Sequence, residues 1–448
     1  MREHLQGHKN SDRIKIICDG VFMNSKQKKL IILGGTSASY DLVRNAKEMG
    51  IYTIVTDPNE TGVSKEIADE TAMVSTADID GIVALAKEKG ADGIFCGPSE
   101  FNLRNVIAAS AKAGLPCYTT MDVWDKCANK DVFKSYCREY GVDCTPEYDI
   151  TLETPASELE KIDYPIIIKP VDGCSSAGIS VCKSAEDVPV ALEKAYAASK
   201  SKKIIAEKYI ENGGELFSVR YMLRDGEAYP YFMMDTYVAD PIHRTSLISG
   251  YTHAPSKYAS YYMEHMDADV RRMLKGMGLR NGTAFIQSLP CNGKIYFHEM
   301  GYRLSGGMIF KLTEPLTGIH DMKMMLRYAV GEGSIREEEA EKIDLSCHGR
   351  IGGQLMMPLD VGTIGRIEGV EKIKDHPAVV DYLQYYDVGD TIEQRVIGTL
   401  GQHFGRITFI VDSPEEELEV IRYFQSIVRV YDVNGKRMNN LQFDVSRF

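Results

Sequence analysis

Hydrophobic and polar positions follow two alternating periods from Lys29 onward. The segment KKLIILGG is an apolar run of strand length, residues 38–49 repeat apolar positions at helical spacing, and IYTIVTD is a second apolar run that ends at Asp57. Strand, helix and strand in this order predict a parallel sheet. Because the alternation continues to about residue 120, residues 29–125 are expected to form one Rossmann-like, doubly wound α/β domain.

The pattern changes twice farther along the chain. Residues 129–140 predict an amphipathic helix, and strand-like runs separated by turn residues follow it. From about residue 346 short glycine-bounded strands lead into a capped helix after Ser413, which is typical of a small α+β domain. We therefore expect α/β and α+β folds in three domains, residues 29–125, 126–332 and 333–448, after a disordered leader at residues 1–28.

Residues 284–307, AFIQSLPCNGKIYFHEMGYRLSGG, predict a β-hairpin that turns at an Asn-Gly pair. Loop length decides which side chains share a face, because a shift of one residue turns every side chain over. A two-residue turn sets Gln287 opposite a histidine, whereas a three-residue loop puts Gln287 and Glu299 on one face. We favour the three-residue loop, which lets these oxygens hold Mg²⁺ while Arg303 holds a phosphate.

Two lysines and a loop of small residues are candidates for binding phosphates. Lys130 projects from the first turn of its predicted helix, and Lys169 ends the short buried strand of YPIIIKP. The loop after Lys169 can cover phosphates with backbone N–H and hydroxyl groups. Its small residues include Gly173, Ser175, Ser176 and Gly178.

Composition and charge narrow the classes of function. The net charge of −12 argues against a general nucleic-acid or anionic-membrane surface, so the expected partner is a small molecule. No apolar run approaches the roughly 20 residues of a membrane-spanning helix, and the N-terminus lacks a signal-peptide core, which predicts a cytoplasmic protein. The ten cysteines form no Cys-x-x-Cys pair, which favours reduced thiols over zinc or disulfides.

Taken as a set, the candidate residues and their order resemble the ATP-grasp superfamily. The resemblance runs from about Lys29 to the C-terminus and includes carboxylate-amine ligases, biotin carboxylases and carbamoyl phosphate synthetases. It rests on Lys130, Lys169, the 173–178 loop, EKYI at 207–210, Glu215, Gln287 and HEMGYRLSGG at 298–307. It implies a pre-ATP-grasp domain in front, a lid subdomain at about 148–208 inside the ATP-grasp domain, and a homodimer formed through the first domain.

The resemblance also implies roles in nucleotide binding. Lys130 and Lys169 would contact the phosphates of ATP, and the loop from 173 to 178 would close over them as a lid. Residues in and after EKYI would line the adenine edge and lie near the ribose. These are Glu207, Tyr209 and Ile210 for adenine and Glu215 for ribose.

The metal and the transferring phosphoryl group would lie at the hairpin. Gln287 and Glu299 would bind Mg²⁺, or Mn²⁺ in its place, and Arg303 with Lys169 would stabilise the phosphoryl group. Two positions depart from the common pattern of the superfamily, which often has Glu in place of Gln287 and Asn in place of Gly301. One metal ligand would then come from water or from elsewhere.

The reaction that the resemblance implies is carboxylate-amine ligation through an acyl phosphate, with ADP and phosphate released. Arg303 followed by Gly306-Gly307 is similar to these ligases, some of which act on amino acids. The alternatives are ATP-dependent carboxylation, formyl transfer or carbamoyl phosphate synthesis in nucleotide metabolism, and a nucleotide-binding regulatory protein. Biotin carboxylation is not favoured, because Ser305 to Met308 replace a Gln-Val-Glu-His-like run. His243, Arg244 and His253 are unranked candidates for the substrate pocket.

Overall fold

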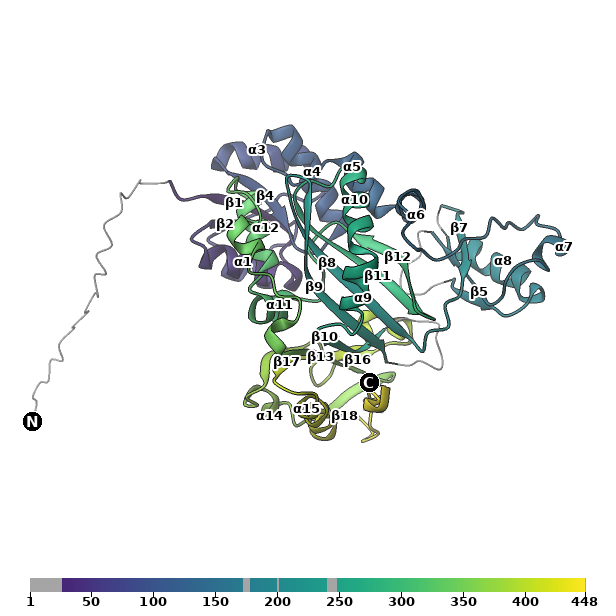
Figure 1. Ribbon diagram of the computed structural model, residues 1–448. Coiled ribbons are helices and arrows are strands. Elements are labelled where there is room, and N and C mark those ends of the chain that lie inside the picture. The colour runs from purple at the N-terminus through teal and green to yellow at the C-terminus, as the bar shows by residue number, and fades with distance from the viewer. Residues whose placement is uncertain (1–25, 172–177, 200, 240–247, 448) are drawn as a thin grey trace, which may run out of the picture.

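The computed structural model describes residues 26–171, 178–199, 201–239 and 248–447 (Figure 1). The predicted leader lies outside these ranges as far as residue 25. Within the described part of the chain, no helix is long and apolar enough to cross a membrane.

A four-stranded parallel sheet with helices around it forms the first layer, which confirms the predicted α/β fold class. Its strand order is β3-β2-β1-β4, and the carboxyl end of β1 therefore lies beside those of β2 and β4. The elements are β1 (Lys29–Leu33), α1 (Tyr40–Glu48), β2 (Tyr52–Thr56), α2 (Val63–Ile67), β3 (Glu70–Ala72), α3 (Ile79–Lys89), β4 (Gly93–Cys96) and α4 (Glu100–Ala113).

A small subdomain projects to one side of the molecule (Figure 1). Its three-stranded antiparallel sheet has the order β6-β5-β7 and packs with α8 around its own apolar cluster. The elements are α7 (Ala156–Leu159), β5 (Ile166–Pro170), β6 (Ser180–Cys182), α8 (Val188–Ala198) and β7 (Ile204–Lys208). A separate core in so small a unit is consistent with its predicted movement as a lid.

An eight-stranded antiparallel sheet connects the middle of the chain with its C-terminal part. The strand order is β12-β11-β8-β9-β10-β13-β17-β15, so the pairing of β10 with β13 carries the sheet across the predicted boundary at residue 333. The strands are β8 (Glu215–Arg224), β9 (Glu227–Val238), β10 (Ser249–Ala254), β11 (Gly282–Cys291), β12 (Lys294–Gly301), β13 (Ile351–Pro358), β15 (Val379–Gln384) and β17 (His403–Val411).

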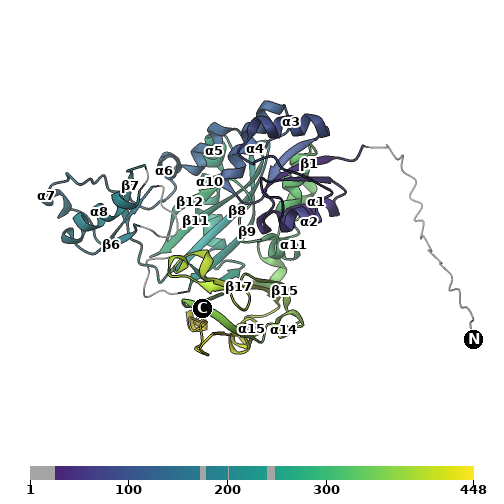
Figure 2. The ribbon, with the colours of Figure 1, turned by 180° about the vertical axis from the view of Figure 1, so that it is seen from behind.

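Two apolar clusters cover different parts of this sheet. The larger one joins the front sheet to β8, β11 and β12 through α5, α6 and α10, and the other surrounds β13, β17 and α15. Seen from behind, α3 lies at the top of the molecule and α14 and α15 lie at the bottom (Figure 2). The remaining elements are α5 (Met121–Ala128), α6 (Lys130–Glu139), α9 (Ala259–His265), α10 (Asp267–Met277), α11 (Phe310–Thr317), α12 (Asp321–Ala329), α13 (Glu337–Ala340), β14 (Gly362–Glu368), α14 (Glu371–Lys374), β16 (Thr391–Ile392), α15 (Pro414–Ile427) and β18 (Arg429–Asp432).

Candidate active site

The β11–β12 hairpin turns through two residues, so the predicted three-residue loop is wrong. Cys291 pairs with Lys294, and Asn292 and Gly293 both have positive φ angles of 50° and 76°, as a type I′ turn requires. Gln287 nevertheless pairs with Glu299, as expected, because the register shifts by one residue between this pair and the next. A β-bulge on β12 therefore compensates for the shorter turn.

Lys130 lies against the predicted metal ligand Glu299. Asn129 caps α6 by accepting the backbone N–H of Asp131 at 3.0 Å, and this fixes Lys130 in the first helical position. The Lys130 Nζ lies 2.9 Å from Glu299 Oε2. Burial raises the pKa of Glu299, but the charges of Lys130, His298 and Lys169 and the hydrogen bond from Lys130 together outweigh burial, and the net pKa is lowered. Glu299 is therefore held as a carboxylate.

A buried ion-pair cluster connects Lys169 with a lysine that the sequence analysis did not select. Lys134 on α6 is 0% exposed and donates to Glu207, and Lys169 Nζ donates to the other oxygen of Glu207 at 2.5 Å. Burial alone would raise the pKa of Glu207, but the charges of Lys169 and Lys134 lower it to about 2. The side chain of Glu207 is thus occupied by lysines, and its backbone lies between Ile167 of β5 and Glu147.

The other residues predicted to bind nucleotide lie around this cluster. Tyr209 and Ile210 follow β7 directly, and the backbone N–H of Tyr209 donates to the Pro165 carbonyl at 3.0 Å. Glu215 begins β8 and pairs with Lys257 at 2.6 Å. Gly178 has a φ of 79°. Gly173, Ser175 and Ser176 lie outside the described residues.

Arg303 connects the hairpin with the front domain. Its Nη2 donates to Glu100 Oε1 at 3.1 Å, and its guanidinium carbon lies 5.3 Å from the centre of the Phe285 ring. Arg220 lies over the same ring at 5.5 Å. The ring carries the two cations through cation–π contact, so both guanidinium groups are held at the hairpin.

Phe285 also explains the glycine at position 301. The two residues pair directly across β11 and β12, and a Cβ at position 301 would overlap the aromatic ring. The position that often carries Asn in the superfamily is therefore filled by the ring of Phe285. A third protein ligand for a metal does not fit here.

We expect Gly301→Asn to destabilise the fold by about 1–3 kcal/mol, because the added side chain overpacks against Phe285. Urea unfolding of both forms measures this loss. The double variant Phe285→Ala/Gly301→Asn provides space for the asparagine. Its loss in free energy of unfolding should therefore be smaller than the sum of the losses of the two single variants. Strict additivity of the two substitutions would show that the ring is not the cause.

A cavity of about 840 Å³ opens beside the hairpin. The predicted residues Gln287, Glu299 and Arg303 all line it, and Lys130 is connected to it through Glu299. Lys169 and its partner Glu207 are not among the lining residues. Its far side consists of residues that the sequence analysis did not select. They are Gln354, Tyr385, Tyr386, His403 and Arg406. Arg220, which the sequence analysis also did not select, lies at the hairpin end over Phe285.

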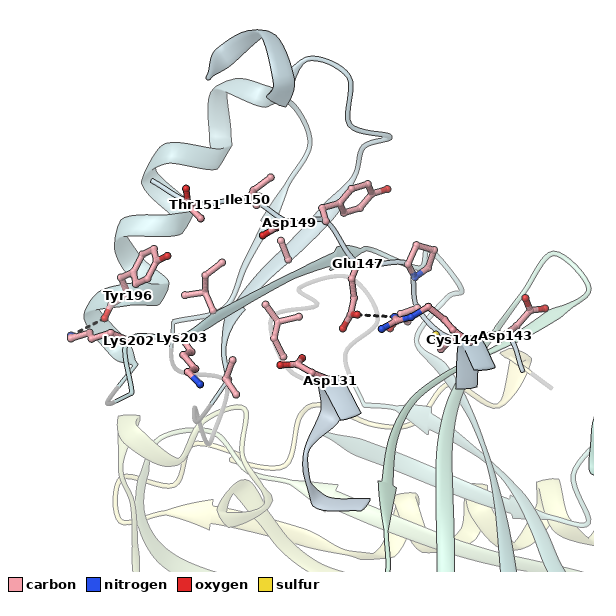
Figure 3. A pocket seen from close by; sticks show the side chains of 18 of the residues that line it. Asp131, Asp143, Cys144, Glu147, Asp149, Ile150, Thr151, Tyr196, Lys202 and Lys203 are labelled. Atoms are coloured by element: carbon pink, nitrogen blue, oxygen red, sulfur yellow. Dashed lines mark hydrogen bonds and ion pairs between the residues drawn. The ribbon is translucent and has the colours of Figure 1, made fainter. Parts of the chain in front are cut away.

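A second cavity, of about 820 Å³, lies between α6 and the projecting subdomain (Figure 3). Asp131 and the chain segment 142–151 line it, with Lys202 and Lys203 on the opposite side. None of the predicted ATP or metal residues lines this cavity. Glu147, which pairs with the buried Lys134, connects this cavity to the buried lysine cluster.

The sequence around His253 is loop-like, but the structure places this residue in a strand. It belongs to strand β10, and its Nδ1 lies 2.6 Å from Glu417 Oε1 on α15. The contact connects the large sheet with the last helix and gives His253 a structural role. His243 and Arg244 lie outside the described residues.

Comparison with known proteins gives the family of the middle segment. Residues 129–335 match the family model for the ATP-binding domain of the carbamoyl-phosphate synthase large chain. The formate-dependent phosphoribosylglycinamide formyltransferase of Wolinella succinogenes is 23% identical over 64% of this chain and 73% of its own length. The biotin carboxylase of Haemophilus influenzae is 24% identical over 68% of this chain and 70% of its own length.

Two solved structures share the fold of nearly the whole chain. The L-amino acid ligase from Bacillus licheniformis has a TM-score of 0.75 at 19% identity and covers 91% of this chain and 99% of its own. The biotin carboxylase domain of the Hydrogenobacter thermophilus 2-oxoglutarate carboxylase, solved with MgADP and bicarbonate, has a TM-score of 0.71 at 19% identity, covering 92% and 91%. Residues 129–335 are therefore an ATP-grasp domain of the carbamoyl-phosphate synthase type, and the chain shares its overall fold with these two enzymes.

Proposed function

We propose that the protein is an ATP-dependent carboxylate-amine ligase that forms a carbon-nitrogen bond on a small metabolite such as an amino acid. One observation carries the proposal. Gln287, Glu299 and Arg303 line one end of a cavity that continues past Gly306 and Gly307 to β13 and β17. A single chamber with a phosphoryl-transfer end and a separate substrate end suits two reactants that must meet away from water.

In the proposed reaction a carboxylate oxygen takes the γ-phosphoryl group of ATP, and ADP leaves. The amine nitrogen then attacks the acyl carbon, and phosphate leaves with the C–O bond electrons. Lys169 and Lys130 would hold the phosphates of ATP, and Arg303 would stabilise the charge on the transferring group. No protein nucleophile is needed, because positioned cations and exclusion of water supply most of the catalysis.

The donor set at the hairpin suits Mg²⁺. Gln287 and Glu299 present an amide and a carboxylate oxygen on paired positions of the cavity wall, and Mg²⁺ prefers such oxygen ligands. Among the described residues no group of three His, Cys, Asp or Glu side chains gathers to hold a metal. Water and nucleotide phosphates would therefore complete the shell, and the ion would neutralise phosphate charge when bound.

Replacing Gln287 by glutamate tests this ligand assignment. A second carboxylate beside Glu299 adds a full negative charge to the site, so the Mg²⁺ concentration for half-maximal ATP turnover should fall about tenfold. A Mg²⁺ titration of the ATPase rate measures the change. An unaltered Mg²⁺ requirement would place the ion away from Gln287.

A second candidate is ATP-dependent formyl transfer or carboxylation in nucleotide metabolism. The relatives support it, since one is named for formate-dependent formyl transfer to phosphoribosylglycinamide and another for biotin carboxylation. A homodimer is part of either proposal, as in the solved biotin carboxylase dimer of the 2-oxoglutarate carboxylase.

Incubation with Mg-ATP and paired panels of carboxylates and amines separates these functions. The panel includes formate and bicarbonate, and the measurements are ADP, phosphate and hydroxylamine-trapped acyl phosphate. A ligase releases ADP only with a carboxylate and gives the hydroxamate of that acid. Tight ATP binding without turnover for any pair would overturn the ligase proposal and favour a nucleotide-binding regulatory protein.

A further inference from the structure

The side of the cavity away from the hairpin is a polar strip that crosses several strands of the large sheet. Thr236 on β9 pairs with Thr252 on β10, Thr252 pairs with Gln354 on β13, and Gln354 pairs with Thr408 on β17. Because directly paired residues project from the same face of a sheet, these side chains form one row. The row continues toward Arg406, two residues before Thr408 on β17 and on the same face.

Arg406 lies in this wall with three of its five N–H donors, those on Nε and Nη2, unpaired among the described residues. It is only 4% exposed and lines the cavity. Its Nη1 donates to the Gly307 carbonyl at 2.7 Å, whereas its Nε and Nη2 have no partner among the described residues. Nε–H and Nη2–H lie on one edge of the guanidinium group and point the same way, which is the arrangement that binds two oxygens of an oxyanion at once.

The residues around Arg406 do not neutralise its charge. Among the charged residues that line the cavity, three are arginines, Arg220, Arg303 and Arg406, and one is a carboxylate, Glu299, which is paired with Lys130. Arg220 is 5% exposed, and its Nε also lacks a partner among the described residues. Arg303 is paired with Glu100, whereas Arg406 has no acidic partner among the described residues. A buried cation with unused donors is costly unless a bound anion pairs with it.

We infer that Arg406 binds an acidic group of the substrate other than the carboxylate that ATP activates. The inference rests on the proposed ligase function and narrows its substrates to compounds with a second oxyanion, either a carboxylate or a phosphate. Gly307 fixes the opposite edge of the guanidinium group, which holds Arg406 in the wall of the cavity while its Nε and Nη2 stay buried and unpaired among the described residues. The arginine therefore selects substrates that carry this second acidic group, and it fixes which end of the substrate faces the hairpin.

Binding of matched pairs to the full chain saturated with Mg-ADP tests this inference without requiring turnover. The pairs are succinate and succinamate, alanine and alaninamide, and phosphoethanolamine and ethanolamine. The first pair tests a second acidic group on the carboxylate substrate, the second pair tests an acidic group on the amine substrate, and the third pair tests a phosphate. In calorimetric titrations, at least one acidic member should bind at least about tenfold more tightly than its neutral partner, as expected for a charge-assisted bidentate contact.

Two substitutions of the same arginine assign the effect. Arg406→Gln should abolish the preference for the acidic member and leave ADP affinity unchanged, and Arg406→Lys should retain only part of it because lysine lacks the planar fork. Arg429→Gln, an exposed arginine on β18, is the matched control and should change neither. Should Arg406→Gln fail to fold, the lysine variant alone decides.

Equal binding of both members of every pair, including no binding at all, would overturn the inference. A preference that survives in both Arg406 variants would overturn the assignment to this residue. These outcomes are distinguishable from failure of the ligase proposal. If the ligase proposal fails, the calorimetric titrations would still show the anion preference while no amide product forms with any pair.

Discussion

Glu299→Ala is expected to abolish Mg²⁺-dependent ATP turnover, with kcat reduced at least about a thousandfold, or roughly 4 kcal/mol of lost transition-state stabilisation. Glu299 is the sole carboxylate among the described residues that line the cavity of the hairpin, and Lys130 keeps it ionised at neutral pH. Its removal takes away the metal's only anionic protein ligand there. Lys130 also loses the partner that holds it in place.

Phosphate release measured over a Mg²⁺ titration checks this expectation. Glu227→Ala is a suitable control, because Glu227 is an exposed glutamate on β9 of the same sheet and pairs only with Lys275 among the described residues. The control should retain full activity. If Glu299→Ala also retained it, the metal site would lie elsewhere.

Glu207→Gln is expected to lower the free energy of unfolding by about 3–5 kcal/mol, the usual cost of leaving buried charges without a partner. The substitution keeps the shape of the side chain but removes the charge between Lys134 and Lys169. Lys134 is fully buried, so it cannot turn to water. Lys169 would lose the group that positions it for the phosphates.

The single tryptophan gives a direct measurement. Trp124 is buried on α5, which packs against α6, so its fluorescence during urea unfolding reports on the region of the cluster. Glu147→Gln is the matched control, since Glu147 contacts the same Lys134 but lies on the more exposed side. It should cost less than about 1 kcal/mol. Equal losses for the two variants would contradict the assigned importance of Glu207.

The same carboxylate predicts a dependence of stability on pH. Its pKa in the folded protein is about 2, below the ordinary value of 4.5, so the folded state binds the proton less readily than the unfolded chain does. The stabilisation from Glu207 is therefore fully present above about pH 4.5 and is lost as the pH falls toward 2. Unfolding midpoints of wild type and Glu207→Gln should converge over this window, and a constant difference down to pH 2 would contradict it.

The sequence pattern was sufficient to predict those parts of the fold that neighbouring residues in the chain determine. The apolar runs and helical spacing from Lys29 predict the parallel sheet, and Asn129 predicts where α6 begins because its side chain satisfies the first free N–H groups. The Asn-Gly pair predicts the hairpin. The order of Lys130, Lys169, EKYI and the hairpin, taken together, predicts the superfamily.

Contacts between residues far apart in the sequence account for the features that the sequence pattern could not predict. Lys134 looks like a solvated lysine of an amphipathic helix, but Glu207, 73 residues later, makes its burial favourable. The β-bulge that restores the pairing of Gln287 with Glu299 leaves no periodic signal in the sequence. The turn is one residue shorter than predicted, and the bulge shifts the register by one residue, so the two differences cancel.

The sequence by itself determined the α/β beginning, the capped helix, the hairpin and the residue types needed for phosphoryl transfer, since neighbours in the chain set these features. Only the tertiary structure decided the two-residue turn, the filling of the Gly301 position by Phe285, and the hydrogen bond that holds Arg406 to the Gly307 carbonyl, 99 residues away. The physical reason is that burial and pairing of charge depend on distant groups, and a linear pattern does not contain those distances.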